Sequence, residues 1–131
     1  MGDADLEQAV EGAITGVRFT RQGQSCTAAN RILVHRSIVD DFVKGLVDKV
    51  NAMVIGDPLD EATDIGTIVS PNQFERVQYY LGLAEASSEA TLYRCGQLPT
   101  DERFSEGLFV QPAIITGLTN EHRVCKEEIF G

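Results

Sequence analysis

Apolar residues recur at three- and four-residue spacing in the first half of the chain, which predicts two amphipathic helices. The first carries its apolar face within residues 6–17 and takes Asp3 as its N-cap. The second starts at Ser37, which opens a capping pattern that closes three residues later, and its apolar stripe continues to Val54. The Gly-Asp-Pro turn at residues 56–58 stops this second helix.

A third amphipathic helix follows a polar loop at residues 57–71. Ser70 is its predicted N-cap, Pro71 occupies the first helical position, and a glutamine follows three residues after the cap. The residues of its inner face are Phe74, Val77, Leu81 and Ala84.

Three short apolar segments are predicted strands. They span residues 31–35, 91–95 and 108–115, and Pro112 indicates an edge or a break in the last one. A short helical turn is expected within residues 121–129. Because long helices alternate with strands, the sequence predicts an α/β fold in which helices pack on an open sheet.

Length and charge limit the classes of function. The chain has 131 residues, which suits one domain, and a formal net charge of −9. An acidic surface repels phosphate backbones, so a nucleic acid is not an expected partner. No apolar run approaches the roughly 20 residues that span a bilayer, and the acidic N-terminus does not resemble a signal peptide. We therefore expect a cytoplasmic protein that does not bind membranes.

Three cysteines and two histidines are the candidates for thiol or metal chemistry. The odd number and wide spacing of the cysteines argue against a disulfide framework and fit a reducing compartment. Cysteine and histidine do not occur at the spacing of zinc ligands, so no metal site is expected. No G-x-G-x-x-G or phosphate-binding loop occurs, so these residues are not expected to contain a dinucleotide-binding half.

Cys26 is the strongest candidate for chemistry, because it follows a glycine-containing turn at residues 23–25. Most lone cysteines are small buried side chains, but the neighbours here are small or polar, which favours a nucleophile held by backbone geometry. The amides of a following helical turn would favour a thiolate and hold an oxyanion. No base lies nearby in the sequence, and the local context leaves both interpretations open.

Glu127 and Glu128 are adjacent acids with apolar flanks. The ordinary interpretation is a solvated surface. The alternative is an acid that reaches a ligand hydroxyl at the mouth of a cleft.

Five segments resemble, in order, motifs of the aldehyde dehydrogenase superfamily. G-Q-S-C at residues 23–26 resembles its active-site motif, and D-A-D-L at residues 3–6 resembles the helix start upstream. G-D-P at residues 56–58 matches a turn, and G-L-F-V-Q-P at residues 107–112 is similar to a strand. E-E-I-F-G at residues 127–131 matches the E-E-I-F-G-P signature. The resemblance covers essentially the whole chain.

The resemblance implies a reaction and a role for several residues. Cys26 would attack an aldehyde to give a thiohemiacetal, hydride would pass to NAD or NADP, and water would hydrolyse the thioester to a carboxylic acid. The Cys26 amide would help hold the oxyanion. Glu128 would bond the nicotinamide-ribose hydroxyls, with Phe130 packing nearby, and Gln73 would make another ribose contact. The partners implied are a small-molecule aldehyde and further copies of the chain in a homo-oligomer.

Several positions depart from the family pattern. Thr67 replaces a usual proline, Ala113 replaces a usual threonine, and Cys95 precedes one glycine where a pair is common. The family's cofactor-binding domain, its general-base glutamate and its oxyanion-hole asparagine precede the segment that matches here. We therefore expect residues 1–131 to be part of the catalytic domain, without the cofactor-binding domain and the oligomerisation arm. We also expect the isolated chain to be inactive and to self-associate through exposed sheet edges.

Two other classes remain open. A non-catalytic folding or oligomerisation module would keep the fold and use no thiol. A cysteine hydrolase would need a histidine near Cys26, whereas His35 lies beyond a predicted strand and His122 is remote in sequence. The identity of the aldehyde and the choice between NAD and NADP depend on segments outside these residues.

Overall fold

The structure, a computed structural model, describes residues 2–131. Four helices, two strands and two 3-10 turns make up its regular elements in this range. In chain order they are α1 (Leu6–Val17), η1 (Phe19–Arg21), α2 (Val39–Asn51), α3 (Pro71–Glu85), β1 (Thr91–Arg94), η2 (Glu102–Phe104), β2 (Ala113–Thr116) and α4 (Arg123–Lys126). The predicted arrangement of helices on an open sheet is confirmed, with the sheet reduced to one antiparallel pair.

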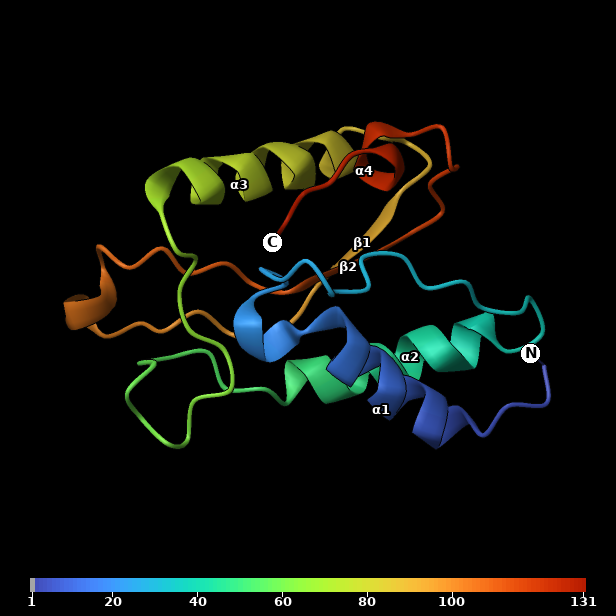
Figure 1. The fold of residues 1–131 in the computed structure, drawn as a ribbon, viewed down its shortest axis with the longest axis horizontal. Helices are drawn as coiled ribbons and strands as arrows, with labels where there is room; N and C mark the ends of the chain where they lie inside the picture. Colours follow the sequence, from blue (N-terminus) through green and yellow to red (C-terminus); the bar gives the residue numbers. More distant parts are fainter. Residues whose placement is uncertain (1) are drawn as a thin grey trace.

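The two strands form the middle layer. Thr91 lies opposite Thr116 and Arg94 lies opposite Ala113. Figure 1 shows this pair between α1 and α2 on one side and α3 with α4 on the other. Because successive side chains of a strand point to opposite faces, the sheet borders two hydrophobic cores.

The larger core lies on the side of α1 and α2, and the smaller lies under α3. Buried members of the larger core include Val10 of α1 and Val50 of α2, with Tyr93 of β1 packed against them. The smaller core contains Val77 of α3, with Leu92 of β1 packed against it. Burying each such aliphatic side chain stabilises the fold by about 1.5–3 kcal/mol.

Helix α1 begins two residues later than predicted. Its N-cap is Asp5, whose carboxylate accepts from the Gln8 amide at 3.0 Å, so the expected cap at Asp3 is wrong. Asp5 directly precedes Leu6, the first residue of the apolar stripe, and this register places Val10 in the core.

Helix α2 differs from its prediction at both ends. Ser37 does not cap it, because the Ser37 hydroxyl lies 2.8 Å from the His35 ring nitrogen Nδ1, and the helix begins at Val39. It ends at Asn51 because the Val54 amide donates to the Asp64 carboxylate at 2.9 Å instead of to the preceding turn. Val54 is therefore exposed rather than part of the apolar stripe.

Helix α3 matches its prediction. Ser70 accepts from the Gln73 amide at 3.3 Å, and Pro71 is the first helical residue. Val77, Leu81 and Ala84 are buried. The expected turn near the C-terminal end is also present, as α4.

The strand predictions have two outcomes. The segment expected at residues 91–95 forms β1 except for its last residue. Of the segment expected at residues 108–115, only the part after Pro112 belongs to β2, so residues 108–112 are not a strand, as a break at the proline requires. The strand expected at residues 31–35 is wrong, because no strand within residues 2–131 pairs with it. Leu33 is 92% exposed there.

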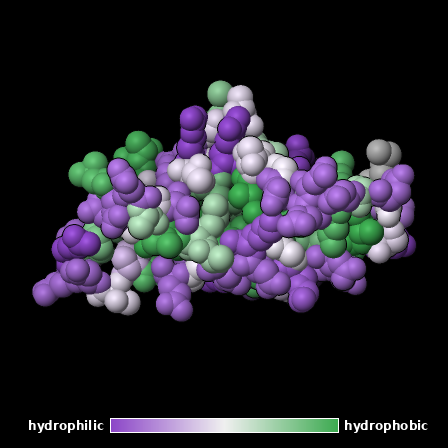
Figure 2. Space-filling model, turned by 90° about the horizontal axis from the view of Figure 1, so that it is seen from below, coloured by the Kyte–Doolittle hydropathy of each residue, from purple (hydrophilic) through white to green (hydrophobic). Residues whose placement is uncertain are grey.

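The surface on the α1–α2 side is mostly hydrophilic, and its hydrophobic residues form separate groups (Figure 2). Across the described range 2–131, none of the helices combines the length and apolar character that crossing a membrane requires.

Candidate active site

Cys26 lies in an irregular loop, residues 22–28, which we call the thiol loop. The thiol is free and exposed. A turn surrounds it, because the Ala28 amide donates to the Ser25 carbonyl at 3.0 Å and the Thr27 amide donates to the Ser25 hydroxyl at 3.3 Å. The next helix begins at Val39, so no helix N-terminus lies directly after Cys26. Within the thiol loop, only the Cys26 amide has no hydrogen-bond partner among residues 2–131, so it is the loop amide available to an oxyanion.

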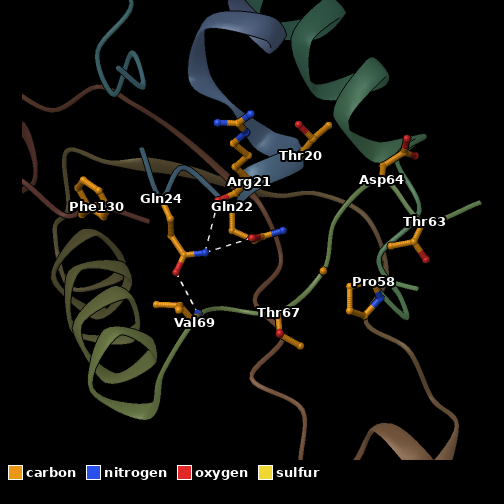
Figure 3. Close-up of a pocket in the computed structure, with 11 residues that line it drawn as sticks. Thr20, Arg21, Gln22, Gln24, Pro58, Thr63, Asp64, Thr67, Val69 and Phe130 are labelled. Atoms are coloured by element: carbon orange, nitrogen blue, oxygen red, sulfur yellow. Dashed lines mark hydrogen bonds between the residues drawn. The ribbon is translucent and has the colours of Figure 1, made fainter. Parts of the chain in front are cut away.

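The thiol loop is attached to three distant parts of the chain. The Gln24 carboxamide oxygen accepts from the Val69 amide at 3.0 Å, a bond visible in Figure 3. The Ala29 amide donates to the Gly16 carbonyl at 2.8 Å, which holds the chain after Cys26. Gly23 has a φ of +69° and lies directly against the backbone of the C-terminal residue. These contacts fix the position of an otherwise irregular loop.

Residues 127–131, which we call the C-terminal segment, run along α3. The Gln73 carboxamide nitrogen donates to the carbonyls of Ile129 at 3.0 Å and Phe130 at 2.7 Å. Arg76 donates to the carbonyls of Ile129, at 3.1 Å, and Glu128. Gly131 packs against the side chains of Val77 and Gln73 of α3 and also against Gly23 of the thiol loop. The structure thus brings the thiol loop, α3 and the C-terminal segment together.

The two adjacent acids have different surroundings. Glu127 accepts from the Tyr80 hydroxyl at 2.6 Å and pairs with Arg123, whose Nε lies 2.7 Å from Oε1. The hydrogen bond from Arg123, then the one from Tyr80, lowers the pKa of Glu127 to about 2. Glu128 is exposed, and among residues 2–131 its carboxylate has no hydrogen-bond partner, since only its carbonyl accepts. Glu127 is therefore a structural acid, and Glu128 is the one open to a ligand.

A groove of about 630 Å³ lies beside the thiol loop. Figure 3 shows Phe130 toward one end of it and Pro58, Thr63 and Asp64 toward the other. Phe130 has a φ of +63°, which is rare for a non-glycine residue, and its side chain is 40% exposed. Cys26 is not part of the groove lining.

Neither histidine serves as a base for Cys26. His35 is hydrogen-bonded to Ser37, and the His122 ring accepts from the Val124 amide at 3.2 Å as the cap of α4. Within the part of the chain from residue 2 to residue 131, the Cys26 sulfur has no hydrogen bond to any side chain. The same residues contain no group of three His, Cys, Asp or Glu side chains placed to hold a metal ion. The geometry gives no support to a cysteine hydrolase.

Sequence reasoning missed Gln24, Arg76 and Tyr80 as contributors to this site. The only signal for the last two is spacing, since they follow Gln73 by three and seven residues on one helix face.

Comparisons with known proteins agree with this arrangement. The model of the family described as "Aldehyde dehydrogenase family" matches residues 1–131. Betaine aldehyde dehydrogenases of Brucella anthropi and Rhizobium etli are 40% and 43% identical over 129 residues, which cover 98% of this chain and 26% of each relative. The chain thus spans about a quarter of their length.

Solved structures give the same result. A betaine aldehyde dehydrogenase from Staphylococcus aureus in complex with NAD+ matches with a TM-score of 0.88 and 36% identity, over 98% of this chain and 25% of that one. An E194S mutant of an aldehyde dehydrogenase from Bacillus cereus matches with a TM-score of 0.85, at the same identity and coverage.

Proposed function

The chain belongs to the aldehyde dehydrogenase family, and from this we propose that the protein containing it oxidises a small aldehyde to a carboxylic acid with NAD or NADP. The observation that carries the proposal is the exposed thiol of Cys26 on a loop attached to both Val69 and the C-terminal segment. Relatives 40% identical are named betaine aldehyde dehydrogenases, so betaine aldehyde is the first substrate to test.

In the proposed reaction the Cys26 thiolate attacks the aldehyde carbon, and a carbon–sulfur bond forms as the carbonyl oxygen becomes an oxyanion. The Cys26 amide donates to that oxygen. A nicotinamide cofactor, when bound, would supply the hydride acceptor, and loss of hydride from the same carbon leaves a thioester on Cys26. Water then attacks the thioester, and the carboxylic acid and the thiol are released. The family's glutamate base would activate that water from a segment outside these residues.

The residues of the C-terminal segment fit a cofactor hydroxyl pair. The Glu128 carboxylate is exposed and accepts no hydrogen bond from residues 2–131, so it is available to ribose hydroxyls. Phe130 offers a partly exposed ring beside it. The Gln73 nitrogen is already engaged with two carbonyls, so only its oxygen is left for a ribose contact. We propose Glu128 as the main ribose ligand, Phe130 as a packing contact and Gln73 as a minor one.

We further propose that residues 1–131 are part of the catalytic domain and that other segments supply the cofactor-binding domain. Residues 1–131 cover about a quarter of the length of the relatives, which supports this. Exposed Leu33 and Val69 support burial against further protein, as in a homo-oligomer. Three free thiols support a reducing compartment such as the cytoplasm.

The test compares the whole protein with its Cys26→Ser variant, following the absorbance of reduced nicotinamide with betaine aldehyde and other small aldehydes. We expect Cys26→Ser to abolish turnover and Cys125→Ser, a control at a half-buried thiol, to retain it. We expect the 131-residue chain alone to reduce no cofactor. No aldehyde oxidation by the parent would favour the non-catalytic module instead, and equal turnover by the Cys26→Ser variant and an active parent would refute the role of Cys26.

A further inference from the structure

One face of α3 donates hydrogen bonds to the C-terminal segment along its whole length. Gln73 donates to the carbonyls of Phe130 and Ile129. Arg76, one turn later, donates to the carbonyls of Ile129 and Glu128. Tyr80, a further turn on, donates to the Glu127 carboxylate at 2.6 Å. Residues three and seven apart share a helix face, so helix and segment run antiparallel with about one contact per turn.

The C-terminal segment depends on these donors because, within residues 2–131, no neighbouring strand is hydrogen-bonded to its backbone. The last backbone hydrogen bond leading into it runs from the Glu127 amide to the Arg123 carbonyl at 2.9 Å. Between residues 2 and 131, no backbone amide donates to the carbonyls of residues 128–130. Side chains of α3 therefore replace the neighbouring strand that usually satisfies an extended segment.

Arg76 has the central position in this set. Its guanidinium bridges two consecutive carbonyls, which its planar fork of donors allows and a single ammonium does not reproduce. The same guanidinium lies 5.2 Å from the centre of the Tyr80 ring and 3.4 Å from the Tyr80 hydroxyl, which limits its rotamers. The carbonyls it holds belong to two consecutive peptides, Glu128–Ile129 and Ile129–Phe130.

Phe130 makes this support necessary. A non-glycine residue at φ +63° is strained by about 1–2 kcal/mol, and such a conformation persists only where surrounding contacts hold it. The contacts available are the Gln73 bond to its own carbonyl, the Arg76 bond to the Ile129 carbonyl just before it and the packing of Gly131 against Val77 just after it.

We propose that Arg76 is a positioning residue for the cofactor contacts at Glu128 and Phe130, an inference that rests on the proposed function. By holding the carbonyls of Glu128 and Ile129 against α3, Arg76 leaves the Glu128 carboxylate and the Phe130 ring free to meet the nicotinamide ribose. Arg76 itself does not touch the cofactor.

The test uses Arg76→Ala and Arg76→Lys in the whole protein, with Gln78→Ala as a control at an exposed position of the same helix. We expect Arg76→Ala to raise both KM and the calorimetric Kd for the nicotinamide cofactor about tenfold, as for the loss of one charge-assisted hydrogen bond. We expect kcat to stay within about threefold, because ground-state and transition-state binding are lost equally. The lysine should restore part of the affinity and Gln78→Ala should change nothing.

A second measurement separates this inference from the proposed function. Hydrogen exchange of the Glu127 amide, whose bond to the Arg123 carbonyl leads into the segment, should be faster in Arg76→Ala than in the parent and Gln78→Ala proteins in the absence of cofactor. Unchanged exchange, or unchanged KM and Kd in an active enzyme, would overturn the inference. A fall in kcat and thermal stability with no change in KM would also overturn it, as a purely structural role. A parent protein that binds cofactor but oxidises no aldehyde would refute the proposed function alone.

Discussion

Ile65 lies in the loop between α2 and α3, and truncating its side chain tests whether its burial anchors that loop to the core. Its side chain is 2% exposed and belongs to the larger core. Its amide donates to the Val54 carbonyl at 3.0 Å, and its carbonyl accepts from the Gly56 amide at 3.0 Å. Ile65→Ala removes three carbons, worth about 2.4 kcal/mol at about 0.8 kcal/mol per buried methylene. A cavity term adds to this, so the expected loss is about 2–5 kcal/mol, and about 1 kcal/mol for Ile65→Val.

The assay is urea unfolding followed by circular dichroism, with Leu59→Ala as the matched control. Leu59 lies in the same loop but is 92% exposed, so its truncation should change the free energy of unfolding by no more than about 0.5 kcal/mol. All variants should keep the parent m-value. If Ile65→Ala costs under about 1 kcal/mol, or no more than Leu59→Ala, the loop is not anchored through this residue and the reasoning fails.

Three further changes test the caps, the acid network and the thiol loop. Ser70→Ala should lower the free energy of unfolding, measured in urea, by about 1 kcal/mol, because alanine removes the acceptor for the Gln73 amide. Ser70→Asp keeps an acceptor and should cause no loss. Equal losses in the two variants would contradict this. The pKa of Glu127 is lowered to about 2 by Arg123, so its stabilisation is complete above about pH 4.5 and disappears as the pH falls toward 2. Glu127→Gln should therefore be less stable than the parent at neutral pH and approach it in acid, and a gap that widens in acid would refute the sign. Gly23→Ala should lower the melting temperature by the equivalent of at least about 1 kcal/mol, because φ is +69° and a Cβ would lie 3.0 Å from the Gly131 carbonyl carbon. An unchanged melting temperature would exclude the close packing of Gly23 against Gly131.

The sequence predicted best the elements whose signals are local. The start and most of the apolar face of helix α3 were predicted correctly because its cap, its first-turn proline and those apolar residues all lie within one short stretch. The start of α2 was wrong because Ser37 has a competing partner two residues away, His35. The strand at residues 31–35 was wrong because a strand needs a neighbour, and a short apolar run carries no information about whether that neighbour is there.

The site was predictable to the extent that motifs carry it. Cys26, Glu128 and Phe130 come from motif resemblance, and their roles remain proposals. Gln24 accepts from a backbone amide 45 residues away and Arg76 donates to a backbone carbonyl 53 residues away, and such a backbone partner leaves no pattern in the sequence around it. The separate surroundings of Glu127 and Glu128 likewise depend on Tyr80 and Arg123, which the acidic pair itself does not reveal.

The contact between Gly23 and Gly131 also limits how this protein can evolve. A Cβ on Gly131 would lie 2.4 Å from a methyl group of Val77, and one on Gly23 would meet the Gly131 backbone. Any side chain at position 131 therefore requires Val77 to shift, so a substitution at position 131 costs less after a smaller residue has appeared at position 77 than before it. The order of mutations, and not only their identity, determines which sequences this family can reach from here.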